Sequence, residues 1–183
     1  MTRSLLLSLL LLGSAACERS PAPPVKVVAA KEDYPALTGR VVDRADLLTP
    51  DQEARLAGKL EALQREIGPQ YVVVTVPSLD GRPIEVYSLA LARRWRLGHK
   101  DRDDGLMLLV APNERKVRIE VGLGLERRVT NGFAADVIRD EALPRFKTGH
   151  YPEGIEAASD ALIGRLRSRA GEPGAAPEKA VAI

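Results

Sequence analysis

Two uninterrupted apolar runs, at residues 71–76 and 106–111, constrain the fold of this 183-residue chain more than any other feature. They read YVVVTV and LMLLVA, and neither shows a simple alternation of apolar and polar positions. Such runs are typical of strands buried on both faces, as in parallel sheets covered by helices. The segment between them carries apolar residues at helical spacing, namely Ile84, Tyr87, Leu91 and Trp95. The order strand, helix, strand predicts a parallel crossover.

The flanking segments indicate further helices. Residues 49–52 (TPDQ) form a capping box with proline at the first helical position, and they predict a helix that ends at Gly68. A second helix is expected over residues 131–143, where Pro144 stops it. A last helix is expected over residues 152–168.

One strand of different character is expected after the second apolar run. Val117, Ile119 and Val121 alternate with charged residues and follow a short hairpin loop at residues 112–115, as in a half-exposed or edge strand. Together these elements predict a single-domain α/β/α sandwich, in which helices flank both faces of a small mixed β-sheet.

The N-terminus has the pattern of a lipoprotein signal peptide. Arg3 supplies a positive start, residues 5–12 are apolar, and residues 13–16 (GSAA) supply the small side chains that signal peptidases need. Cys17 follows at once and is the only cysteine, so we expect residues 1–16 to be removed and Cys17 to be lipidated. The same small residues also suit ordinary secretory cleavage, which would leave an exported protein with a free thiol.

Composition extends this interpretation beyond the signal segment. Residues 17–37 are rich in proline, alanine and charge and are expected to form a flexible tether, with the domain at 38–168 and a disordered tail at 169–183. The formal net charge is +2 with both signs interspersed, so no nucleic-acid partner is expected. We expect a lipid-anchored protein on the periplasmic side of a membrane. Glu18 follows the cysteine and favours the outer membrane over the inner one.

Conventional catalytic motifs are scarce. His99 and His150 lack metal-ligand spacing, no G-x-S-x-G is present, and Gly122 and Gly124 are interpreted as a bend after the hairpin. The concentrated acidic feature is residues 101–105 (DRDDG), directly before the second apolar run. Oxygen-rich loops of this kind suit Ca²⁺ or Mg²⁺. In isolation the same composition is also typical of a hydrated turn.

Several blocks, in order, resemble the TPM domain family, which includes thylakoid-lumen phosphatase-like proteins and bacterial exported proteins. The blocks include D-D-G-L-M-L-L-V-A, R-K-V-R-I-E-V-G-L-G-L-E and P-R-F-K-T-G-H-Y-P-E-G-I, and the resemblance covers residues 38–167. It implies an α/β sandwich, a divalent-cation site in an acidic pocket and, for some members, acid phosphatase activity.

The resemblance also indicates which residues would form the cation site. Asp103 and Asp104 correspond to the acidic pair before the central strand, and Asp43 matches an acidic position at the domain start. Asp140 lies on the helix where the family often has an acid. Asn131 stands where many members have aspartate, so it keeps a carbonyl oxygen but removes a negative charge.

Three functions are compatible with these observations. The first is a membrane-tethered accessory module of the cell envelope that binds another envelope protein and takes Ca²⁺ or Mg²⁺ in its acidic pocket. The second is a metal-dependent phosphatase acting on phosphate monoesters, in which Asp103 and Asp104 hold the metal and Asp43 or Asp140 acts as base. The third is a purely structural domain. We prefer the first, because it asks only for a tether, a stable sandwich and one acidic pocket.

Overall fold

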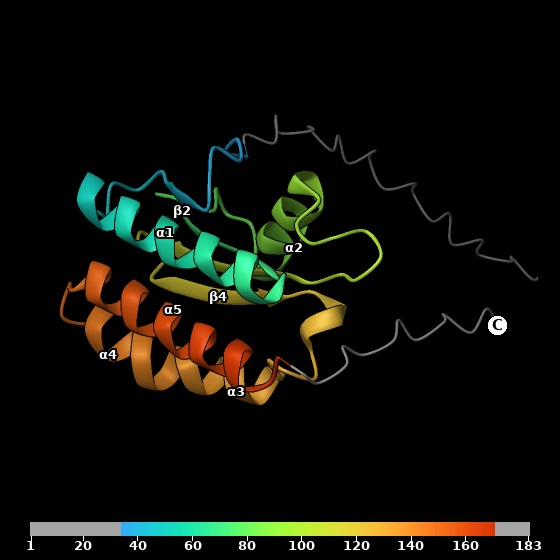
Figure 1. Ribbon diagram of the computed structural model, residues 1–183. Coiled ribbons are helices and arrows are strands. Elements are labelled where there is room, and N and C mark those ends of the chain that lie inside the picture. The colour runs from blue at the N-terminus through green and yellow to red at the C-terminus, as the bar shows by residue number, and fades with distance from the viewer. Residues whose placement is uncertain (1–33, 171–183) are drawn as a thin grey trace, which may run out of the picture. The chain divides into compact units, whose positions relative to one another are not determined.

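The computed structural model describes residues 34–170, which form one α/β domain (Figure 1). In chain order its elements are β1 (Val41–Asp43), α1 (Pro50–Ile67), β2 (Gln70–Thr75), α2 (Ile84–Trp95), β3 (Gly105–Ala111), β4 (Lys116–Val121), a 3₁₀ turn η1 (Leu123–Leu125), α3 (Asn131–Asp136), a π-helical segment η2 (Val137–Ala142), α4 (Leu143–Phe146) and α5 (Tyr151–Ser168).

The four strands form one mixed sheet in the order β1-β2-β3-β4. β2 pairs in parallel with both β1 and β3, while β4 pairs antiparallel with β3 at the edge. All seven residues of β3 are buried, and so are five of the six in β2. The two apolar runs are therefore the central strands, and the predicted parallel crossover through α2 is confirmed.

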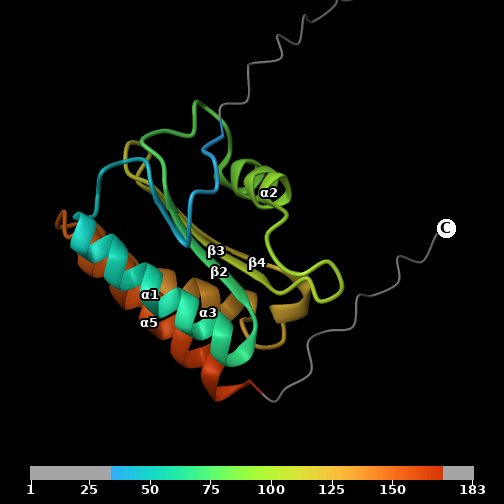
Figure 2. The ribbon, with the colours of Figure 1, turned by 45° about the horizontal axis from the view of Figure 1, so that its top comes forward.

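Helices cover both faces of this sheet, which confirms the predicted sandwich (Figure 2). α2 lies on one face, and α1 and α5 with the α3–α4 segment lie on the other. Alternate strand residues enter two separate cores: Tyr71 and Leu108 belong to the core beneath α1 and α5, whereas Val74 and Leu109 belong to the core beneath α2. Continuous apolar strands are required because each face has its own helical layer.

The first helix begins and ends where its sequence signals place it. The Thr49 hydroxyl accepts from the Gln52 backbone N–H, and the Gln52 side chain accepts from the Thr49 N–H at 2.8 Å. Gly68 closes the helix at a φ of 100°, a conformation that favours glycine. A capping box satisfies two N–H groups that a helix start otherwise leaves without partners.

The prediction that Pro144 stops the preceding helix is wrong. The helical path continues from α3 through η2 into α4, and Pro144 lies in the first turn of α4. The π-helical register of η2 provides the physical reason, because it widens the helix just before the proline. A proline lacks the N–H of a regular turn and clashes with the carbonyl four residues earlier, and a π segment relieves both constraints.

Two features at the start of the domain have no counterpart among the sequence-based predictions. The three-residue strand β1 is too short to produce a periodic pattern. Residues 34–37, predicted to be part of the tether, pack against α2. The Tyr34 ring meets the Tyr87 ring edge-on at 4.9 Å between centroids, and Trp95 Nε1 donates to the Pro35 carbonyl at 2.9 Å.

Within residues 34–170 no helix is both long enough and apolar enough to cross a membrane. The predicted signal segment, Cys17 and most of the predicted tether and tail lie outside the described residues.

Candidate functional site

The five residues predicted to hold a cation are distributed over both ends of the sheet and the helical layer that covers one of its faces. Asp43 ends β1 and lies in register with Thr75, which pairs with Val110 near the end of β3. Asp103 and Asp104 precede Gly105 at the start of β3. Gly105 and Val110 are five positions apart in β3, which corresponds to about 17 Å along the strand. The structure therefore brings Asp103 and Asp104 together but does not bring Asp43 to them.

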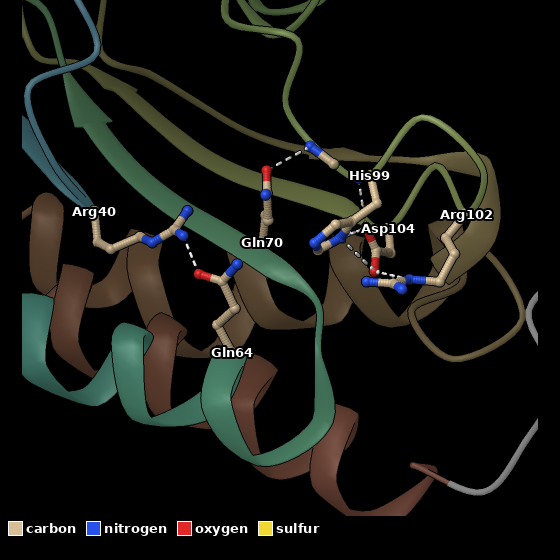
Figure 3. A network of polar contacts seen from close by, with 7 residues as sticks. Arg40, Gln64, Gln70, His99, Arg102 and Asp104 are labelled. Atoms are coloured by element: carbon tan, nitrogen blue, oxygen red, sulfur yellow. Dashed lines mark hydrogen bonds and ion pairs between the residues drawn. The ribbon is translucent and has the colours of Figure 1, made fainter.

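Asp104 is the central acceptor of the loop before β3 (Figure 3). Its Oδ1 accepts from the His99 backbone N–H and lies next to His99 Nδ1, both at 2.8 Å, while Oδ2 accepts from Arg102 Nε at 2.8 Å. Burial by itself raises the pKa of this carboxyl group. The donors at His99 and Arg102 outweigh that effect and hold its pKa below the ordinary value of 3.8. Asp104 is thus an internal anchor of the loop.

Glycines allow the anchored loop to pack directly on the segment after β4. A Cβ atom at Gly122 would lie 2.1 Å from the Asp103 carbonyl oxygen, and one at Gly124 would lie 1.8 Å from the Arg102 carbonyl oxygen. The close approach is held by the Gly124 N–H, which donates to the Asp103 carbonyl at 3.1 Å. The glycines after the hairpin thus let two backbones touch, and they make no nucleotide-binding turn.

Asp43 has a similar anchoring role at the other end of the sheet. One of its oxygens accepts from the Leu48 backbone N–H at 2.7 Å, and the other accepts from the Thr75 hydroxyl. The Thr75 hydroxyl in turn accepts from the Ala45 N–H at 3.0 Å. These bonds close the connection between β1 and α1 and occupy both oxygens of the Asp43 carboxylate.

The remaining two predicted ligands lie on the helical layer opposite α2. Asp140, in η2, is exposed and forms two hydrogen bonds with Arg139, which lower the pKa of the carboxyl group. Asn131 is the exposed first residue of α3, directly after its N-cap Thr130. Across residues 34–170 no group of three or more His, Cys, Asp or Glu side chains is arranged to hold a metal ion. The five residues do not fit a single cation site.

A groove lies beside the acidic loop, with a volume of about 420 Å³. Asp103, Glu120 and Glu126 are its three carboxylates. Glu120 is already engaged, because it accepts from the Ser88 hydroxyl at 2.7 Å and from Arg118 Nε at 2.8 Å. The apolar wall comes from α2, the segment after it and η1: Leu89, Ala92, Leu97 and Leu123.

Some large apolar side chains stay exposed, and two of them line the groove. Among residues 34–170 those with substantial exposure are Leu37 (43%), Val86 (55%), Leu89 (40%) and Leu123 (49%). Leu89 and Leu123 line the groove, and Val86 lies one helical turn before Leu89. Leu37 follows the segment that packs on α2. The apolar wall of the groove therefore continues along α2 to Val86.

Sequence reasoning missed two features of this site. His99 supplies two of the donors to Asp104, but a lone histidine five residues before an acid carries no recognisable spacing. The outward residues of α2 were detectable in principle. Val86 and Leu89 repeat at i and i+3 on the side opposite Ile84 and Leu91, so the helix is apolar on two sides.

The architecture places the molecule among small α/β sandwich domains with a four-stranded mixed sheet. The chain matches the TPM domain over residues 41–165, and it belongs to the TPM domain family. No curated protein matches the sequence.

Three similar solved structures come from bacteria. The N-terminal domain of a protein from P. gingivalis has 34% sequence identity and a TM-score of 0.69, with 74% of this chain and 87% of that chain covered. The N-terminal domain of a Corynebacterium glutamicum protein has 16% identity and a TM-score of 0.57, covering 80% and 90%. A protein of the psychrophilic bacterium Bizionia argentinensis has 14% identity and a TM-score of 0.59, covering 68% and 84%. The last two show the fold alone.

Proposed function

We propose that the protein is a membrane-tethered interaction module of the cell envelope, and that the groove beside α2 recognises a protein partner. One observation carries this proposal: of the four exposed large apolar side chains among the described residues, Leu89 and Leu123 line this groove and Val86 lies one helical turn before Leu89. Contiguous apolar surface of this kind costs solubility in a monomer and marks interaction sites.

The groove also suits a partner of definite chemistry. Its wall is aliphatic, while the side-chain carboxylates of Asp103 and Glu126 on its rim form no hydrogen bond or ion pair with other residues in the range 34–170. Arg93 is the cation at the α2 side of the rim. A partner segment with an apolar face and a basic residue would cover the wall and neutralise the free carboxylates.

Site-specific photo-cross-linking in the producing cell tests this proposal. A benzoylphenylalanine at position 89 or 123 is expected to give a discrete cross-linked species. The same residue at position 61 is the control, because Glu61 is exposed on α1, which covers the other face of the sheet. Identical products at all three positions, or none at 89 and 123, would contradict recognition through the groove.

Divalent-cation binding stays part of the proposal, in a reduced form. Asp103 is the one predicted ligand in the groove, and Glu126 is the other carboxylate there without a hydrogen-bond partner in the described range. Two free carboxylates support only weak Ca²⁺ binding, in the range of about 0.1–1 mM typical of extracellular modules. A calorimetric titration of Ca²⁺ and Mg²⁺ into the wild type and Asp103→Asn is the measurement.

Both results of that titration are informative. Saturable heat that is lost in Asp103→Asn supports a cation in the groove, whereas no saturable heat removes the cation from the proposal. Phosphate release from 4-nitrophenyl phosphate that needs the metal and disappears in Asp103→Asn would favour the alternative function, a metal-dependent phosphatase.

A further inference from the structure

A second cavity lies at the opposite end of β3 from the acidic loop. It has a volume of about 480 Å³ and opens between the β3–β4 hairpin and the turn that joins α4 to α5. Its floor includes Val110 at the end of β3 and Leu143, Phe146 and Tyr151 from the helical layer. The volume falls within the range of about 300–1,000 Å³ that is usual for ligand sites.

The charge of this cavity has one sign. Arg115 and Lys116 reach it from the hairpin, Lys147 reaches it from the end of α4, and no carboxylate is among its lining residues. None of these three cations forms a salt bridge within residues 34–170. The nearest acid in sequence, Glu114, is turned toward the β2–α2 connection, where its Oε1 accepts from the Ser78 hydroxyl and the Leu79 N–H. The Ser78 hydroxyl and, to a smaller extent, the charge of Lys116 lower the pKa of the Glu114 carboxyl, but Lys116 and Glu114 form no salt bridge. The three cations are therefore available to an anion.

The aromatic part of the floor is fixed in advance. The rings of Phe146 and Tyr151 stack with their centroids 5.0 Å apart and their planes at 29°. Phe146 lies directly on the backbone of α5, because a Cβ atom at Gly154 would come within 2.4 Å of its ring. A glycine in the helix thus lets the ring sink toward the core, and the stacked pair presents a firm apolar surface.

We propose that this cavity binds an acidic peptide segment that carries an aromatic side chain. The aromatic side chain packs on Phe146 and Tyr151, and flanking carboxylates pair with Arg115, Lys116 and Lys147. Recognition of acidic motifs by clustered basic residues is a recurrent mode of peptide binding. The peptide is favoured over a lipid surface because the apolar part is a concave floor, whereas membrane-binding faces insert protruding apolar side chains.

This site goes beyond the function proposed above. It differs from the α2 groove in position and in charge, since the groove carries three carboxylates and the cavity carries three cations. Either site can fail its test without affecting the other.

Fluorescence anisotropy with a labelled Glu-Asp-Trp-Asp-Glu peptide and the full-length chain in mild detergent tests the proposal. We expect saturable binding, in the range of roughly 10 μM to 1 mM, that weakens as salt rises. The double variant Lys116→Glu/Lys147→Glu should bind at least about tenfold more weakly. Both lysines are exposed, so these changes leave the core intact.

The chain provides a matched control with the same change of charge. Arg94→Glu/Lys100→Glu alters two exposed cations that line neither the cavity nor the α2 groove, and it should leave the affinity for the peptide unchanged. Equal losses of peptide affinity in the two double variants would show that net charge alone causes the effect, and they would overturn the proposed site. No saturation at millimolar peptide would overturn it as well.

A variant peptide and two competing small molecules test the proposed class of ligand. Replacing the tryptophan of the peptide by serine should abolish most of the binding, and equal binding of the serine peptide would contradict the role of the aromatic floor. Dihexanoyl phosphatidylglycerol or phenyl phosphate should displace the peptide poorly. Displacement by either one at concentrations below the peptide's own dissociation constant would assign the cavity to a phosphate-bearing ligand and overturn the peptide proposal.

Discussion

The carboxylate of Asp104 is held by three donor atoms from two residues, and its side chain is only 8% exposed. Hydrogen bonds to a buried charge are stronger than neutral ones, and breaking them leaves donors without partners. Asp103, one residue earlier, is exposed and has a left-handed backbone with a φ of 47°. Two adjacent aspartates thus have opposite roles, one in the fold and one at the groove.

Replacing Asp104 by asparagine is expected to destabilise the domain by about 1–3 kcal/mol, because the charged acceptor is lost while its donors stay in place. The same change at Asp103 should alter stability by less than about 0.5 kcal/mol, as for other exposed positions. Unfolding in urea, followed by circular dichroism, measures both variants. Equal and small effects would contradict the anchoring role of Asp104.

Low pH should remove the contribution of the Asp104 carboxylate to the free energy of unfolding. Its pKa in the folded state lies below the ordinary 3.8, so its stabilisation is fully present above that value and is lost as pH falls through the folded pKa. The unfolding free energy of the wild type should therefore fall more steeply below about pH 4 than that of Asp104→Asn. Parallel pH profiles for the two proteins would exclude this coupling.

At this scale the sequence predicted the acidic loop, but it could not show which of its aspartates anchors the loop and which stays free. The roles depend on donors at His99 and Arg102, and these meet Asp104 only after the loop has folded back on itself. Asp43 shows the same limit, because its partner Thr75 lies 32 residues away in the chain. Charge and spacing indicate where acids are, whereas tertiary contacts decide which acids remain free.

At the scale of elements, the loop before β3 and the 3₁₀ turn after β4 behave as one unit. They meet backbone to backbone at Gly122 and Gly124, so no side chain fits between them. The groove depends on this contact, because Asp103 lies on one side of it and Leu123 on the other.

Gly122→Ala should therefore destabilise the domain by about 2 kcal/mol or more. The added Cβ would overlap the Asp103 carbonyl, and neither of the two backbone segments can shift easily to relieve the overlap. Gly58→Ala is the matched control. Gly58 lies inside α1 with open space around its Cβ position, so alanine there should stabilise the protein by about 0.5–1 kcal/mol. Thermal unfolding of both variants is the measurement, and a neutral Gly122→Ala would contradict the rigid contact.

Elements with strong periodicity or strong caps were predictable, and those determined by their neighbours were not. α1 has a capping box at one end and a glycine at the other, so its bounds follow from local chemistry. β1 exists because it pairs with the edge of β2, and its three residues carry no pattern of their own. The helix through Pro144 needs the π register of η2, which no simple period indicates.

At the scale of the whole molecule, the two sides of the sheet are covered to different degrees. α1, α5 and the α3–α4 segment pack over one face, whereas α2 alone covers the other together with residues 34–37 (Figure 2). The exposed apolar residues Val86, Leu89 and Leu123 lie on α2 or line the groove beside it. The chain enters the described domain on that same side, since Tyr34 packs against Tyr87 of α2.

Substitution of Cys17 separates the anchor from the recognition surface. If Cys17 carries lipid, the wild type should incorporate labelled palmitate and fractionate with membranes, while Cys17→Ser should do neither. Leu89→Ser/Leu123→Ser should keep both properties, because it changes only the groove, but should lose the cross-linked species formed from a probe at position 86. Palmitate-free wild type in the soluble exported fraction would replace the lipid anchor with plain secretion. In that case no membrane anchor would bring the protein and its partner together, and the complex would depend on the affinity of the groove alone. Leu89→Ser/Leu123→Ser would then abolish the complex in solution as well.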